Sequence, residues 1–273
     1  MTVRDVVRVL EQRYPPSLAE EWDAVGLTVG NPDATVRRVL FAVDPVAVVL
    51  DEALVLQADL IVTHHPLFLR GVHSVAAVNH KGRLVHELVS HGIALFSAHT
   101  NADSACPGVS DALADVLGVV DTRPLDPSPS DPSVGLGRVG TLAEPMTLAT
   151  FADRVASVLP ATAQGVRVAG DPEAVIRSVA VSGGAGDSHL AMAQMSGADV
   201  YVTSDLRHHR AQDHLVEGGC ALIDVAHWAG EWPWLSVAAE ALRADLAERG
   251  ATVEVHVSTI PTDPWTLHRG STR

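Results

Sequence analysis

Two segments of the chain, residues 36–65 and 176–205, align with each other without a gap at a spacing of 140 residues. The matched positions are Val39 with Val179, Ala58-Asp59 with Ala198-Asp199, and Val62-Thr63 with Val202-Thr203. Each segment has the pattern of a strand, a connection, a helix and a second apolar strand that ends in Thr. This pattern indicates a β–α–β unit in a parallel sheet. Chance similarity between two common β–α–β patterns is the alternative.

A second pair of segments extends the similarity at a spacing of 128 residues, GIALFSAHTNAD (92–103) and CALIDVAHWAGE (220–231). Each is a short apolar strand followed by Ala-His, three residues and an acid. We therefore expect an α/β fold of two pseudo-repeated lobes with mostly parallel sheets. Because ligands of open α/β sheets bind outside the carboxyl ends of strands, we expect a metal site in the cleft between the lobes.

The domain boundaries follow from a stretch dense in Pro, Ser and Asp, DTRPLDPSPSDPSVGLG (121–137). We predict a first lobe over 1–122, a linker over 123–136 and a second lobe over 137–273. We also predict a helix over 147–160 with Thr147 as its N-cap, and a helix within 241–260 that stops at Gly250 before a strand.

Composition limits the classes of partner. Apolar residues make up 47% of the chain and charged residues 19%, which is typical of a globular protein. The net charge of −14, without a Lys/Arg cluster, argues against duplex nucleic acid or an anionic membrane as a partner. Two cysteines, no signal-peptide pattern and no apolar run near about 18 residues lead us to expect a cytoplasmic protein.

The adjacent histidines in DLIVTHHPLFLR (59–70) stand where an apolar run ends, at His64-His65-Pro66. Imidazole nitrogens and carboxylate oxygens suit Zn, Mn, Fe, Co or Ni, and two-ion hydrolytic sites use both kinds of ligand. Hydrogen-bonded structural histidines are the alternative. The chain has no H-E-x-x-H motif and no thiolate set for structural zinc.

The two acids that follow histidines complete this candidate set. Asp103 lies four residues after His99, and Glu231 lies four residues after His227. This spacing puts both groups on one side of a turn or a helix start. A helix-capping carboxylate beside a surface imidazole is the alternative for each pair.

Two further features have open interpretations. The stretch VSGGAGDSHL (181–190) follows a strand, and its Ser182, Gly183 and Gly184 are candidates for binding an anionic substrate through backbone N–H groups. A tight strand–helix turn is the alternative. The tryptophans of HWAGEWPWL (227–235) fit either a base-stacking platform or core and interface anchors.

The chain resembles the Nif-three-like family, also called "GTP cyclohydrolase I type 2 homologue" or "dinuclear metal center hexameric protein". The resemblance rests on EWDAVGLTVG (21–30), VTHHPLF (62–68), HTNAD (99–103), GADVYVTSD (197–205) with His209, and HWAGE (227–231). The chain departs from the family pattern at Ala24, where Asn is usual, and at Ser204, where Gly is usual.

The resemblance implies two divalent metal ions per chain and a homo-hexameric toroid with sites facing an internal cavity. The implied ligands are His64, His65, Asp103, His227 and Glu231. The remaining motif histidines, His99 and His209, are candidates for proton transfer or substrate contact. The short segment 121–137 leaves no room for the domain that some members insert there.

We therefore predict a metal-dependent hydrolase that acts on a nucleotide, a small phosphoester or a cyclic amidine. A non-catalytic metal-binding or adaptor toroid is the alternative from a different class. A hydrolase needs an open coordination position and a nearby base, whereas a store or scaffold needs neither.

Overall fold

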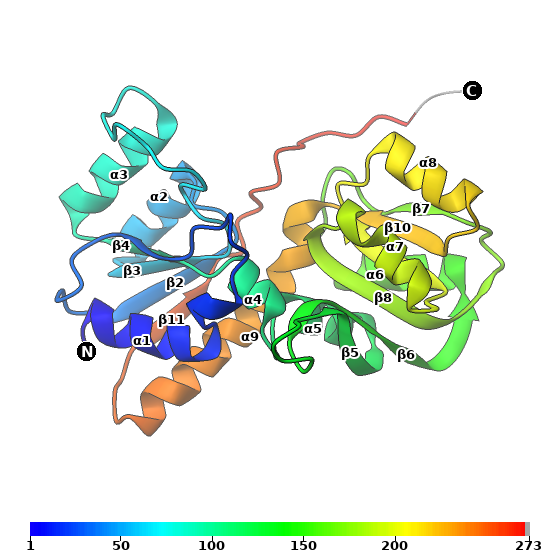
Figure 1. Cartoon of the computed structure of the whole chain (residues 1–273). Coiled ribbons are helices and arrows are strands. Elements are labelled where there is room, and N and C mark those ends of the chain that lie inside the picture. Colours follow the sequence, from blue (N-terminus) through cyan, green and yellow to red (C-terminus); the bar gives the residue numbers. More distant parts are fainter. Residues whose placement is uncertain (271–273) are drawn as a thin grey trace. The chain divides into compact units, whose positions relative to one another are not determined.

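The computed structural model describes residues 1–270 and consists of two compact units (Figure 1). Unit 1 comprises Met1–Ala105 and Leu235–Thr262, and unit 2 comprises Cys106–Trp234 and the residues from Asp263 onward. The chain therefore crosses between the units after Ala105, within the helix that contains Trp234 and Leu235, and after Thr262. Among residues 1–270, no helix is both long and apolar enough to cross a membrane.

Unit 1 contains a sheet with the strand order β1-β4-β3-β2-β11. The strands are β1 (Gly26–Val29), β2 (Arg38–Ala42), β3 (Leu60–Thr63), β4 (Ala94–Ser97) and β11 (Glu254–Val257). All neighbours pair in parallel except β1 with β4. The helical elements are α1 (Val3–Arg13), η1 (Pro16–Leu18), α2 (Ala47–Leu56), α3 (His80–His91), α4 (Thr100–Ser104) and part of α9 (His227–Glu248).

Helices cover both faces of this sheet (Figure 1). The side chains of Leu40 and Leu95 point to one face, where they pack with Leu50 of α2 and Leu88 of α3. Because successive strand residues face opposite ways, Phe41 points to the other face and is fully buried there. The apolar run that ends at His64 is therefore a buried parallel strand, as its sequence predicts.

Unit 2 contains a sheet with the strand order β5-β6-β8-β9-β10-β7. Its strands are β5 (Val119–Pro127), β6 (Gly135–Thr147), β7 (Arg167–Ala169), β8 (Val175–Ala185), β9 (Val200–Ser204) and β10 (Ala221–Val225). The pairs β8–β9 and β9–β10 are parallel, and the other pairs are antiparallel. The helical elements are α5 (Val109–Leu117), α6 (Leu148–Val158), η2 (Asp187–His189), α7 (Leu190–Met195), α8 (His208–Val216) and the start of α9.

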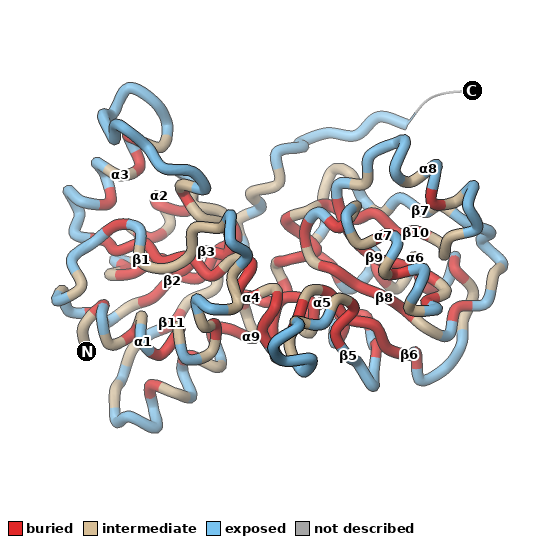
Figure 2. Tube along the Cα trace, in the orientation of Figure 1, coloured by how far each residue is buried: buried red, intermediate tan, exposed pale blue. Residues whose placement is uncertain are grey.

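Two apolar clusters lie on opposite faces of the unit 2 sheet. Phe151 of α6 packs with Val181 and Val202 on one face. On the other face, Tyr201 packs with Leu190 of α7 and with the partly buried Leu215 of α8. Figure 2 shows the buried strands of both units and the exposed outer sides of their helices. The predicted fold class, an α/β fold with two sheets built around parallel pairs, is confirmed.

The repeat seen in the sequence has a counterpart in strand register. Val39 pairs with Leu60 between β2 and β3, and Val179 pairs with Val200 between β8 and β9. Both pairs are related by the spacing of 140 residues. This identical register supports a structural repeat over chance similarity.

The conserved spacing extends to one side-chain contact. The Asp59 carboxylate accepts hydrogen bonds from the backbone N–H groups of Arg37 at 2.7 Å and Arg38 at 3.0 Å. The Asp199 carboxylate accepts the equivalent bonds from Arg177 and Ser178, both at 2.8 Å. Each carboxylate satisfies two N–H groups where the first strand of its unit's repeat begins.

The second sequence alignment shifts by one residue within the strands. Thr63 pairs with Ser97, whereas Thr203 pairs with Asp224, so the structural spacing of these partners is 127 rather than 128. The ladder between β9 and β10 continues to Val225. This extra residue restores the spacing of 128 at the histidines that follow.

The segment 123–136, expected to be a linker, lies mostly in the antiparallel pair β5–β6, and only its centre forms the connecting loop. Pro and Ser are therefore concentrated in a hairpin loop. The buried Arg138 of β6 binds Asp111 of α5 at 2.6 Å, which ties α5 to the hairpin within unit 2. Residues 271–273 of the expected second lobe lie outside the described residues.

The helices and the last strand agree closely with the sequence pattern. Thr147 caps α6, and α9 stops before Gly250, which has φ +72°. The strand expected after Gly250 is β11, and it joins the unit 1 sheet beside β2. In α1, Val9 is buried where the helical pattern favoured Val7.

Removing either repeated carboxylate is expected to destabilise its own sheet. Asp59→Ala and Asp199→Ala each leave two backbone N–H groups without their acceptor, which costs about 1–3 kcal/mol of unfolding free energy. Urea unfolding measures this loss. Asp51→Ala on the exposed side of α2 is the control and should stay within about 0.5 kcal/mol of wild type. Equal stability of all three variants would contradict the role assigned to the carboxylates.

Candidate metal centre

Unit 1 gathers three imidazoles at the carboxyl ends of β3 and β4. One ligand atom from each of His64, His65 and His99 lies within 4.8 Å of the others. The Asp103 carboxylate joins this group, with Oδ1 3.7 Å from Nε2 of His64. His99 is the N-cap of α4, and the backbone N–H of Asp103 donates to the His99 carbonyl, which confirms the predicted i, i+4 relation.

Each of these imidazoles is held through its Nδ1 atom. Nδ1 of His64 lies 2.9 Å from the Ala98 carbonyl oxygen. Nδ1 of His65 lies 2.7 Å from Oδ1 of Asp44. An acceptor at Nδ1 places the ring proton there and directs the Nε2 lone pair elsewhere, which is the usual arrangement of metal-binding histidines.

The third imidazole, His99, has its Nδ1 2.8 Å from Oδ1 of Asp23. The other oxygen of Asp23 accepts hydrogen bonds from the backbone N–H and the hydroxyl of Thr100. Burial alone raises the pKa of the Asp23 carboxyl, but hydrogen bonds from His99 and Thr100 outweigh burial and hold this pKa below its usual value. Asp23 is therefore a fixed anion that orients His99 and the start of α4.

Unit 2 carries a second group at the start of α9. Nε2 of His227 lies 2.9 Å from Oε1 of Glu231, and Nδ1 of His227 lies 2.7 Å from Oδ2 of Asp205. Asp205 directly follows β9 and has φ +56°, a left-handed conformation that Asp adopts more readily than most residues. Glu231 is only 2% exposed. Its charge, together with the hydrogen bonds from both carboxylates, raises the pKa of His227 to about 11 against the opposing effect of burial.

Glycines make room for this pair. A Cβ atom on Gly184, which has φ +68°, would lie 2.5 Å from Oε1 of Glu231 and 3.2 Å from Nε2 of His227. A Cβ atom on Gly183 would lie 2.6 Å from Val109 and 3.6 Å from Cγ of Glu231. The Gly-rich stretch predicted to bind substrate is thus the end of β8, at an irregularity in its pairing with β9. Its observed contacts are with the candidate ligands.

The donor sets fit a divalent transition metal. Both units combine imidazole nitrogens with a carboxylate, and the oriented rings direct Nε2 toward the carboxylates Asp103 and Glu231. Van der Waals space beside Glu231 is kept open by glycine backbone. A bound divalent ion supplies positive charge that compensates the buried Glu231 carboxylate.

The remaining predicted residues have different surroundings. Ser182 is buried, and its hydroxyl donates to the Gly183 carbonyl at 3.3 Å. His209 is exposed on α8, with its ring 5.1 Å from that of His208. Trp228 and Trp234 are buried, which favours their reading as core residues over a stacking platform.

Sequence reasoning missed the three carboxylates that orient the rings. Asp23 lies in the EWDAVG motif, and Asp205 is the acid of the T-S-D motif, so both had a signal in the quoted patterns. Asp44 follows β2 and also accepts a hydrogen bond from the Thr262 hydroxyl. Its signal was the polar residue directly after a buried apolar strand.

Two α/β units with oriented imidazole–carboxylate groups at the ends of parallel strands define a candidate metal-binding α/β protein. The chain belongs to the Duf34/NIF3 (NGG1p interacting factor 3) family, whose model matches residues 1–264. This confirms the resemblance found in the sequence motifs.

Known relatives cover almost the whole chain. A Streptomyces coelicolor protein named "GTP cyclohydrolase 1 type 2 homolog" is 54% identical over 98% of this chain and 94% of its own length. The crystal structure of a Bacillus cereus protein related to NIF3 has a TM-score of 0.92 at 25% identity, covering 98% of this chain and 99% of that one. A Staphylococcus aureus structure has a TM-score of 0.90 at 30% identity, with the same coverage.

The substitution Gly184→Ala tests the space beside Glu231. It should displace the Glu231–His227 pair and destabilise the protein by about 1–3 kcal/mol beyond the backbone strain. Gly197→Ala is the matched control, because Gly197 has φ +77° and open space around its Cβ position. Urea unfolding of metal-free protein and the imidazole NMR resonances of His227 measure the two effects. Identical results for both variants would show that Gly184 makes no room for the pair.

Proposed function

We propose that this chain holds two divalent metal ions and uses them to hydrolyse a small substrate. The ligands are His64, His65 and Asp103 of unit 1 with His227 and Glu231 of unit 2, and a carboxylate of Asp103 or Glu231 bridges the ions. The observation that carries the proposal is the anchoring of four imidazoles through Nδ1, in two groups that each include a carboxylate. Structural histidines have no need of this shared orientation.

Chain connectivity supports a joint site. Asp103 lies directly before the crossing from unit 1 to unit 2 after Ala105, and Glu231 lies directly before the crossing at Trp234. Both candidate carboxylates therefore belong to short helical turns beside covalent links between the units. Such links limit how far each carboxylate is able to move from the other unit.

The protein residues would perform the following steps. The metal ions lower the pKa of a bound water and polarise the group under attack. His99, held by Asp23, accepts or donates a proton at Nε2, and His209 of α8 is a second candidate for this role. Gly183, Gly184 and Ser182 lie beside Glu231, where backbone polar groups contact the substrate.

The substrate class in this proposal is a nucleotide, another small phosphoester or a cyclic amidine. The name of the Streptomyces coelicolor relative, "GTP cyclohydrolase 1 type 2 homolog", supports opening of a C=N bond in a ring. A homo-hexamer in the cytoplasm is part of the same proposal. It rests on the family resemblance and on the composition.

Metal content tests the ligand assignment. Purified wild-type protein should carry about two divalent ions per chain by elemental analysis. Glu231→Gln and His64→Ala should each lose one or both ions, because each removes a donor from the set. Glu240→Gln changes an exposed carboxylate of the same helix and should retain both. Wild type without metal, or full occupancy in Glu231→Gln, would contradict the assignment.

Turnover separates a hydrolase from a non-catalytic metal toroid. Metal-stripped protein is reloaded with Mn, Zn, Fe or Co and assayed with nucleotides and phosphoesters. We expect hydrolysis with at least one metal and a loss of about 100-fold or more in His99→Ala with metal content retained, as for removal of a general acid or base. Two bound ions with no hydrolysis of any substrate would favour the toroid that binds metal without catalysis.

A further inference from the structure

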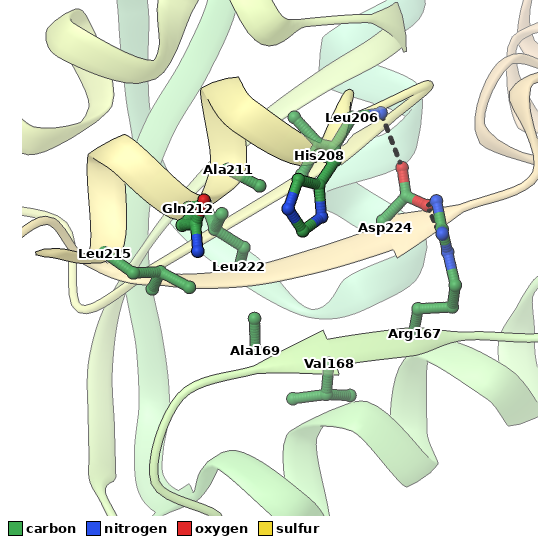
Figure 3. A pocket seen from close by; sticks show the side chains of 10 residues that line it. All are labelled: Arg167, Val168, Ala169, Leu206, His208, Ala211, Gln212, Leu215, Leu222 and Asp224. Atoms are coloured by element: carbon green, nitrogen blue, oxygen red, sulfur yellow. Dashed lines mark hydrogen bonds and ion pairs between the residues drawn. The ribbon is translucent and has the colours of Figure 1, made fainter.

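A slot with no assigned role lies within unit 2, between α8 and the edge of the sheet formed by β10 and β7 (Figure 3). Its volume is about 410 Å³, within the range of roughly 300–1,000 Å³ found for small-molecule sites. The apolar part is formed by Ala211 and Leu215 of α8, Leu222 of β10 and Ala169 of β7. The first half of the repeat has no equivalent, since β4 is flanked there by β1.

The polar end of the slot is built around a buried carboxylate. Asp224 is 5% exposed and accepts hydrogen bonds from the backbone N–H of Leu206 at 3.0 Å, the amide of Gln164 at 3.1 Å and the guanidinium of Arg167. Both oxygens of Asp224 are therefore occupied by donors. This network fixes the Arg167 guanidinium at the mouth of the slot (Figure 3).

The groups that remain at this end are hydrogen-bond donors. The Arg167 side chain is 61% exposed, so part of its five-donor guanidinium faces solvent beside the slot. The imidazole of His208, the first residue of α8, projects between α8 and β10 (Figure 3). A ligand acceptor placed here meets N–H donors, whereas a ligand cation meets Arg167.

We propose that this slot binds a small amphipathic monoanion, with its carboxylate toward Arg167 and His208 and its apolar body against Leu215 and Leu222. Guanidinium recognises carboxylates by paired hydrogen bonds, and charge-assisted bonds are stronger than neutral ones. The apolar walls accept a short aliphatic chain or a single ring. The site uses none of the proposed metal ligands, so it stands independently of the metal centre.

Isothermal titration with octanoate, 1-octanol and octylamine tests the ligand class on the full chain. Octanoate should bind once per chain, with 1-octanol and octylamine each weaker by about tenfold or more. Ala211→Leu fills the apolar part and should weaken octanoate binding by about tenfold or more. Ala156→Leu, an exposed helical alanine of α6, is the matched control and should bind as wild type does.

Removing Arg167 alone would leave Asp224 buried without its cation, so the charge test uses the double variant Arg167→Gln/Asp224→Asn. In this variant octanoate should lose its advantage over 1-octanol. Metal content of each sample is measured in parallel and should equal that of wild type. The proposal is overturned by equal binding of octanoate and 1-octanol to wild type, by unchanged affinity in Ala211→Leu, or by no octanoate binding to wild type.

Discussion

The parallel pairing of β3 with β2 and β4 determines where the imidazoles of unit 1 lie. The ladder runs past the ends of the strands, because the N–H groups of His64 and His65 donate to the carbonyls of Ala42 and Val43. On the other side, the N–H of Ala98 donates to the carbonyl of Thr63, which brings His99 level with the paired histidines. A shift of one residue in this register would turn every side chain of β3 to the opposite face.

Unit 2 repeats this scheme with a different balance of ligands. In the aligned repeat, Asp205 occupies the position of His65, and Ser204 occupies that of His64. The imidazole-rich end of unit 1 therefore becomes a carboxylate-rich end in unit 2, where Asp205 and Glu231 flank His227. The extra residue of β10 keeps His227 at the start of α9 despite the shifted strand pairing. One fold thus presents two complementary donor sets.

Local sequence pattern was sufficient for the features that depend on neighbouring residues. The buried strand before His64, the i, i+4 relation of His99 and Asp103, the cap at Thr147 and the stop at Gly250 all follow from short-range rules. Two relatives of known structure at TM-scores of 0.90 and above support the same fold class.

Features that depend on distant pairing were not accessible in this way. The strand β11 joins the sheet beside β2, more than 200 residues earlier in the chain, and periodicity contains no information about such a partner. The Pro/Ser-rich segment was read as a linker because hairpin loops and linkers share a composition. Asp44 and Asp23 were missed because a single acid after a strand resembles an ordinary turn residue.

The irregular end of β8 indicates which part of unit 2 is shaped by the site rather than by sheet stability. Regular pairing with β9 is interrupted between Val181 and Ala185, and Gly184 adopts a positive φ there. Glycine in a strand interior weakens the sheet, and an unpaired bulge leaves backbone groups to be satisfied elsewhere. The Thr203 hydroxyl compensates in part by donating to the Gly184 carbonyl at 3.1 Å. Because the interruption lies where a side chain would collide with Glu231, the departure from regular structure is explained by the space that the carboxylate needs.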